Sequence, residues 1–159
     1  MKTAIIYYSY NGNSALLAEM IKDAVNADVF EIKAMDQKKR KGFGLILWGG
    51  FQVIRNKKPA LQPLHADVKV YDLIVLGTPV WAGSPSPALV SFLDKTKITG
   101  KKIALFCSHG GGPGDVFKKL QALLQGNEII GELDVRNPAA MGKPELKQKV
   151  GEWVKKFAQ

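Results

Sequence analysis

The sequence predicts an α/β protein: a three-layer α/β/α sandwich around a five-stranded parallel sheet. Five short apolar segments alternate with segments whose apolar residues recur at helical spacing. Crossovers between parallel strands are right-handed, which places helices on both faces of the sheet. The chain has 159 residues and is 46% apolar, which suits one core. We therefore expect a single domain over residues 1–159.

The first elements form a βαβ unit. Residues 3–8 are predicted to be a strand, residues 14–26 a helix, and residues 28–32 a short second strand with alternating apolar side chains. Residues 34–67 interrupt this rhythm with a basic run, the apolar and glycine-containing segment Phe43–Ile54, and an extended stretch with two prolines. We expect Phe43–Ile54 to be a second helix of the sandwich, packed by Leu47, Phe51 and Ile54.

The second half returns to regular alternation. Residues 71–77 form a continuous apolar run, as in a central parallel strand that is covered on both faces. A loop over residues 78–83 and a helix entered through Pro85 and Pro87 are expected next. Residues 102–107 are predicted to be a buried strand that leads into a glycine-rich loop at 108–114. A helix, a fifth strand at 129–135 and a final helix complete the chain.

The turn after the first strand has the composition of a phosphate-binding site. It holds only small polar residues apart from Tyr10, and Gly12 allows the backbone to curl so that several N–H groups converge. These groups would lie at the positive end of the following helix dipole. The alternative is that Asn11-Gly12 is an ordinary turn and that Ser14 is a helix N-cap.

Two further loops are unusual, and both follow predicted parallel strands. Residues 78–83 contain Trp81 in what we expect to be an exposed loop, and residues 108–114 contain four glycines that allow backbone to approach a flat ligand. In open parallel sheets, ligands bind beyond the carboxyl ends of the strands. All three loops should therefore converge on one site, for a ligand with a phosphate and a planar ring system such as FMN.

These motifs resemble those of the flavodoxin family. The run from Ser9 to Ser14 is similar to the flavodoxin phosphate loop, and Gly77-Thr78-Pro79-Val80-Trp81 is similar to its flavin-contacting loop after the third strand. The resemblance covers the whole chain and implies strand order 2-1-3-4-5 and non-covalent FMN. Carried over by position, it implies that the turn holds the phosphate, that Trp81 stacks on the isoalloxazine ring, and that backbone amides from Ser108 onward meet the pyrimidine edge. The cofactor-binding residues implied in this way are Ser9, Tyr10, Asn11, Gly12, Asn13, Ser14, Thr78, Pro79, Val80, Trp81, Ala82, Gly83, Ser108, His109, Gly110 and Gly111.

The chain departs from the family in three respects. Asn11 stands where threonine is usual, and Ser108-His109-Gly110 stands where many flavodoxins have a second aromatic residue. Flavodoxins are typically acidic, whereas this chain carries a formal net charge of +9, with eight basic residues and one acidic residue between positions 33 and 58. Such a segment suits an acidic protein partner, an anionic membrane surface or nucleic acid, or it is only a solvated face.

Other chemistries are excluded by missing residues. No Walker motif is present, the glycines at 110–114 lack the spacing of a dinucleotide fingerprint, and the position five residues after Cys107 that a phosphatase would fill with arginine is Pro113. We expect Cys107 to be a buried residue at a strand end. With only His65 and His109, no metal site is expected, although His109 could titrate beside a flavin.

The function predicted first is that of a low-potential electron carrier between redox proteins, with no catalytic side chain required because the flavin supplies the chemistry. The alternative is an FMN-dependent NAD(P)H:quinone-type oxidoreductase, and a third hypothesis is a binding module that docks on an anionic surface. We expect redox partners with acidic docking surfaces, no nucleic acid, and a monomer or weak homodimer.

The single cysteine and the absence of a leader or a long apolar run predict a cytoplasmic protein without a membrane span. The outer apolar residues of Phe43–Ile54, flanked by bases, are predicted to dock a partner or a second copy.

Overall fold

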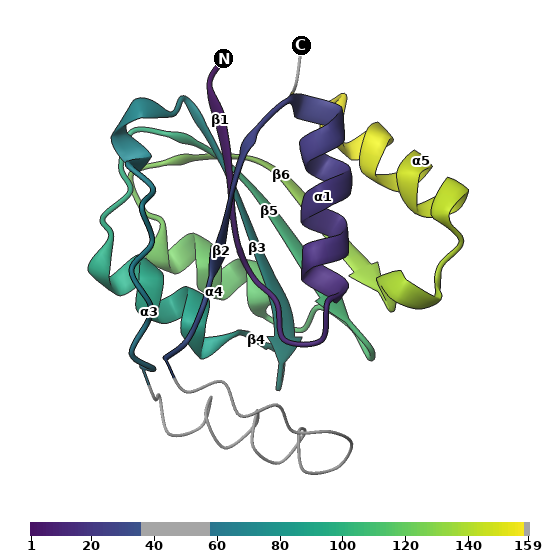
Figure 1. The fold of residues 1–159 in the computed structure, drawn as a ribbon, viewed down its shortest axis with the longest axis horizontal. Coiled ribbons are helices and arrows are strands. Elements are labelled where there is room, and N and C mark those ends of the chain that lie inside the picture. Colours follow the sequence, from purple (N-terminus) through teal and green to yellow (C-terminus); the bar gives the residue numbers. More distant parts are fainter. Residues whose placement is uncertain (36–57, 158–159) are drawn as a thin grey trace.

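The central sheet is parallel and has the predicted strand order (Figure 1). The computed structural model describes residues 1–35 and 58–157. Along the sheet the strands lie in the order β2-β1-β3-β5-β6, and each neighbouring pair is parallel. Counted without the two-residue strand β4, this is the expected order 2-1-3-4-5, so the fold prediction is confirmed. The strands are β1 (Thr3–Tyr8), β2 (Asp28–Ile32), β3 (Leu73–Trp81), β4 (Ser84–Pro85), β5 (Lys102–His109) and β6 (Glu128–Arg136).

Helices cover both faces of the sheet. In Figure 1, α1 (Asn13–Val25) and α5 (Lys143–Val154) lie on one side, and α3 (Pro87–Lys95) and α4 (Val116–Leu123) lie on the other. Two 3₁₀ turns, η1 (Val68–Val70) and η2 (Pro138–Ala140), complete the described elements. Alternate residues of a strand face opposite layers, so Ile5 packs in the core under α1 and α5, whereas Ile6 packs in the core under α3 and α4. None of the helices in the described residues is long and apolar enough to cross a membrane.

The prediction of a loop at residues 78–83 is wrong. Strand β3 continues to Trp81 and turns back into β4, so that Val80 pairs with Pro85 and Trp81 with Ser84 in antiparallel register. Ala82 and Gly83 form the turn with φ values of 49° and 67°, and a hairpin turn with two positive φ values matches the twist of the paired strands. Pro79 pairs with Ser108 at the last position of the β3–β5 ladder. Because it lies at the end, the N–H that proline lacks costs the ladder little hydrogen bonding.

Two smaller boundaries also differ from expectation. Pro85 belongs to β4, and α3 begins at Pro87, after the N-cap residue Ser86, whose side chain accepts the N–H of Leu89. Strand β5 continues through Ser108 to His109, so the glycine-rich loop begins two residues later than predicted. Both differences arise where a short polar residue sits at an element end, a position that apolar spacing does not resolve.

An extended strap leads from residue 58 to η1 along the α3 side. Residues 33–35 pair with residues 60–62 through two backbone bonds, from Met35 N–H to the Ala60 carbonyl at 2.8 Å and from Gln62 N–H to the Lys33 carbonyl at 2.8 Å. The start of the strap is also tied to α3, because Lys58 lies 2.9 Å from Asp94. The predicted helix Phe43–Ile54 and most of the basic segment lie outside the described residues.

Candidate functional site

Three segments from separate parts of the chain meet at the carboxyl edge of the sheet. They are the turn at residues 9–14 after β1, the β3–β4 hairpin, and the segment from Ser108 to Asp115 at the end of β5 (Figure 1). Each pair is joined by a contact: Ser14 Oγ to Ser108 Oγ at 2.9 Å, the rings of Tyr10 and Trp81 at 5.6 Å between centroids, and Asp115 N–H to the Gly83 carbonyl at 3.0 Å. The structure therefore brings the three predicted loops together.

The turn at residues 9–14 gathers backbone N–H groups around one oxygen. Ser9 Oγ accepts the N–H groups of Gly12 and Ala15, each at 3.2 Å. Gly12 is the N-cap of α1, with a φ of 93° that favours glycine, and the first turn of α1 contains no acidic residue. These N–H groups lie at the N-terminus of α1, which is the positive end of its helix dipole. The Ser9 hydroxyl thus marks a place where an anionic oxygen would be stabilised.

Ser14 has a different local role from the N-cap that was considered for it. It lies inside α1, is 1% exposed, and shares a hydrogen bond with Ser108 on β5. Asn13 connects the turn in another direction, because its Oδ1 accepts the N–H of Ala139 in η2 at 3.0 Å. Asn11 stabilises the turn itself by accepting the N–H of Asn13 at 3.3 Å. Short polar side chains therefore fasten the turn to two neighbouring segments.

Trp81 is half-buried at the end of β3, whereas the sequence predicted an exposed-loop residue. Its ring meets Tyr8 edge-on at 6.0 Å between centroids and 86° between planes, and it meets Tyr10 at 77°. Burial raises the pKa of Tyr8 to about 12, so this phenol stays neutral at physiological pH. Through the ring of Tyr10, the indole connects the hairpin to the turn at residues 9–14.

The other hairpin residues divide between structural and exposed positions. Thr78 is fully buried, and its hydroxyl accepts the N–H of Ser86 at 2.9 Å, which holds the base of the hairpin. Pro79 is buried, Val80 is partly buried, and Ala82 is exposed at the tip. Thr78 and Pro79 are therefore covered by the protein itself and offer a ligand little or no surface.

The His109 side chain is turned toward the neighbouring strand β6. Its Nε2 lies 3.0 Å from Asp134 Oδ2, the imidazole is 6% exposed, and the carboxylate is 49% exposed. Its Nδ1 is buried and has no hydrogen-bond partner among the described residues. A carboxylate oxygen at this distance can accept a hydrogen bond from an Nε2–H. Asp134 was missed by sequence reasoning, because it lies two residue pairs along the ladder from His109 and only the register of β5 and β6 brings the two together.

Cys107 is buried at the end of the apolar part of β5, as predicted. Burial raises the pKa of its thiol from 9.0 to about 12. A group whose folded-state pKa is raised stabilises the fold below its unfolded pKa, and this contribution is lost as the pH rises through the folded value.

We therefore expect the free energy of unfolding to fall between pH 9 and pH 12, with part of the fall due to Cys107. Urea unfolding at several pH values should show a shallower decline for Cys107→Ala, by up to about 1.4 kcal/mol per pH unit. Parallel declines in the two proteins would show that the thiol does not titrate in this range.

The residues at the carboxyl edge fit FMN. Backbone N–H groups at the start of α1 suit a phosphate, and a Cβ added at Gly12 would meet no atom within 4 Å, so the space in front of the turn is open. Gly110 and Gly111 are exposed after β5, and a Cβ at Gly111 would also meet nothing. These glycines present exposed backbone at the same edge of the sheet as Trp81, which suits the approach of a flat ring system.

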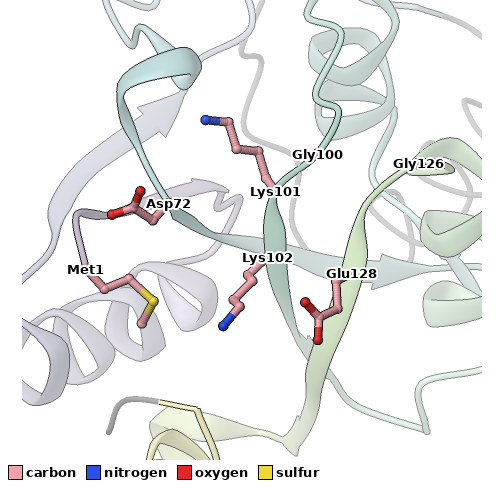
Figure 2. Close-up of a pocket in the computed structure, with 7 residues that line it drawn as sticks. All are labelled: Met1, Asp72, Gly100, Lys101, Lys102, Gly126 and Glu128. Carbon is pink, nitrogen blue, oxygen red and sulfur yellow. The ribbon is translucent and has the colours of Figure 1, made fainter.

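A hollow lies at the opposite, amino edge of the sheet (Figure 2). It is lined by Met1, Asp72, Gly100, Lys101, Lys102, Gly126 and Glu128. Its charges are mixed, and the two lysine side chains point apart. The Lys101 ammonium already donates to the Lys69 carbonyl at 2.8 Å. Because parallel sheets bind ligands at the carboxyl edge, this hollow is separate from the candidate site.

Comparison with known proteins identifies the family. The model of the NADPH-dependent FMN reductases matches residues 1–145. The chain belongs to this family. A relative from Gluconacetobacter diazotrophicus, an NAD(P)H dehydrogenase (quinone), is 28% identical over 151 residues, which cover 83% of this chain and 70% of that protein.

Solved structures place this FMN reductase family member among flavodoxin-like proteins. A flavoprotein from Lactobacillus acidophilus, solved in complex with FMN, is 26% identical with a TM-score of 0.73, covering 96% of this chain and 97% of that chain. A flavodoxin from Bacillus cereus shares the fold at 20% identity and a TM-score of 0.61, covering 99% and 98%. The predicted flavodoxin-like flavoprotein is confirmed, and FMN as the expected cofactor agrees with the family.

Proposed function

We propose that this protein binds FMN without a covalent link at the three-segment site and acts as an FMN-dependent oxidoreductase that accepts hydride from NAD(P)H and reduces a quinone-type acceptor. The observation that carries the binding proposal is the pairwise joining of the three segments, above all the link between Ser14 and Ser108. The family and the quinone-reducing relative support the reductase hypothesis over the electron-carrier function that the sequence predicted first.

In this proposal each segment has a separate task. The N–H groups of Gly12 and Ala15, which donate to Ser9 Oγ in the ligand-free protein, transfer to the phosphate when it binds, and the Ser9 hydroxyl then turns to donate to the phosphate as well. Trp81 packs against the isoalloxazine ring, and its position between two tyrosines limits how far the indole can rotate. Exposed backbone at Gly110 and Gly111 faces the pyrimidine edge. The bound flavin supplies the hydride chemistry, and the protein orients and shields it.

The electron carrier remains the second candidate because of charge. A net charge of +9 favours encounter with an acidic protein, and an acidic redox partner would suit an electron carrier, although flavodoxins themselves are typically acidic. Both candidates use the same cofactor site. They differ in whether NAD(P)H reacts directly with the bound flavin.

Anaerobic mixing of the FMN-loaded protein with NADPH or NADH distinguishes the two candidates. We expect NAD(P)H to reduce the bound flavin by two electrons. The visible absorbance of the flavin should then disappear completely, and no one-electron-reduced form should accumulate. The reduction should slow when the transferred hydrogen of the nicotinamide is deuterium. Free FMN at the same concentration is the control. Failure of both nucleotides to reduce the bound flavin, with a one-electron-reduced form accumulating on photoreduction, would contradict the reductase proposal and favour the carrier.

A further inference from the structure

The β3–β4 hairpin that carries Trp81 is too short to be stable by itself. Its ladder has two residue pairs, Val80 with Pro85 and Trp81 with Ser84, and the Thr78–Ser86 hydrogen bond holds its base. Isolated two-stranded ladders are marginal in water even when they are longer. The orientation of Trp81 must therefore depend on contacts from outside the hairpin.

Helix α4 and the residues before it supply such contacts. The N–H of Asp115 donates to the Gly83 carbonyl at 3.0 Å. Gly114 packs so closely that a Cβ on it would lie 2.5 Å from Gly83 Cα. The Lys119 ammonium donates to Ser84 Oγ at 2.5 Å. Ser84 is 5% exposed and pairs with Trp81 across the ladder. Lys119 therefore holds the residue directly opposite Trp81.

The position of Lys119 in α4 makes this contact informative. The helix begins at Val116, and its first turn contains no acidic residue. A cation near a helix N-terminus opposes the helix dipole and disfavours the helix by a few tenths of a kcal/mol or more. Lys118 shares this unfavourable position, so what distinguishes Lys119 is its charge-assisted hydrogen bond to a buried hydroxyl.

We propose that Lys119 is a positioning residue for the flavin ring: by holding Ser84, it fixes the hairpin so that Trp81 is oriented for stacking before the cofactor binds. This inference rests on the proposed FMN site. It predicts that Lys119 affects the ring half of the site and leaves the phosphate half, at the opposite segment, unchanged.

The test compares Lys119→Met with Lys118→Met. Both changes remove one positive charge from the same turn of α4, and Lys118 is an exposed neighbour. The indole N–H resonance of Trp81, identified by its loss in Trp81→Phe, should shift or broaden in ligand-free Lys119→Met and stay in place in Lys118→Met. Lys119→Arg, which can reach the same hydroxyl, should restore the wild-type resonance.

Flavin titrations give the second readout. Lys119→Met should raise the Kd values of FMN and riboflavin by the same factor, about three- to tenfold, as expected for loss of part of a charged hydrogen bond. In a Ser84→Ala background, the same substitution should have little further effect. If Lys119→Met does not fold, Ser84→Ala against wild type supplies the same comparison of resonance and Kd.

Three results would overturn the inference: an unmoved Trp81 resonance in Lys119→Met, equal effects of the two lysine changes, or a rise in the Kd of FMN alone. The last result would place Lys119 near the phosphate. If the wild-type protein binds neither flavin, the proposed function fails, while the indole resonance of the ligand-free protein still decides whether Lys119 positions Trp81.

Discussion

Replacing Ser9 with Asp is expected to abolish the preference of the protein for FMN over riboflavin. The Ser9 hydroxyl accepts the N–H groups of Gly12 and Ala15 at the start of α1. A carboxylate there would hold these donors more strongly than the neutral hydroxyl does, and it would repel a phosphate that carries about two negative charges. Two charge-assisted hydrogen bonds contribute about 3 kcal/mol or more, which corresponds to about a hundredfold preference in the wild-type protein.

The control for this change is Ser9→Asn, which has nearly the same shape as Asp and no charge. Quenching of flavin fluorescence gives both Kd values. We expect the ratio of the riboflavin Kd to the FMN Kd to fall to about one in Ser9→Asp, with the riboflavin Kd itself changed less than threefold, and to stay well above one in Ser9→Asn. An unchanged ratio in Ser9→Asp would show that the phosphate binds elsewhere.

Gly77→Ala is expected to cause the largest loss of stability. Gly77 lies in the middle of β3, and a Cβ there would lie 2.0 Å from Phe106 Cζ and 2.4 Å from its Cε1. The Phe106 ring is fully buried, so it cannot move aside without displacing the core under α1 and α5. Overpacking of this severity costs about 3 kcal/mol.

Urea unfolding measures this cost, and Gly151→Ala is the matched control. Gly151 lies within α5, where a Cβ would meet no atom within 4 Å, so alanine should raise the free energy of unfolding by about 0.5 to 1 kcal/mol. A loss below about 1 kcal/mol in Gly77→Ala would show that the Phe106 ring has room to shift, contrary to the packing described for this face of the sheet.

The layered fold could be predicted because its signal is local. Strand β1 is a six-residue run that is entirely buried, and Leu17 and Ile21 lie on one face of α1, so apolar spacing alone indicates both elements. The strand order came from the flavodoxin resemblance and not from the spacing. The chemistry of the first turn was also visible, because Ser9 and Gly12 are types that arrange backbone N–H groups.

The hairpin and the side-chain links could not be predicted in this way. A two-residue turn at Ala82 and Gly83 depends on tertiary contacts from Asp115, which lie far along the sequence. The Ser14–Ser108 bond and the His109–Asp134 pair depend on register between segments that the sequence places only approximately. Polar residues at strand ends have no periodicity, so their partners emerge only from the assembled sheet.

The apolar segment Phe43–Ile54 and its basic flanks lie outside the described residues, so their role as a docking surface stays a prediction. Glu replacements at Phe43 and Trp48 would test it through changes in association.

Amide chemical shifts on addition of FMN test the central claim most directly. We expect the backbone amides of Gly12 and Ala15 to shift strongly with FMN and weakly with riboflavin, while Gly111 and the Trp81 indole shift with both ligands. The account would be contradicted if these groups stayed in place while shifts appeared at the amino-edge hollow near Lys101, because FMN would then bind at the opposite edge of the sheet.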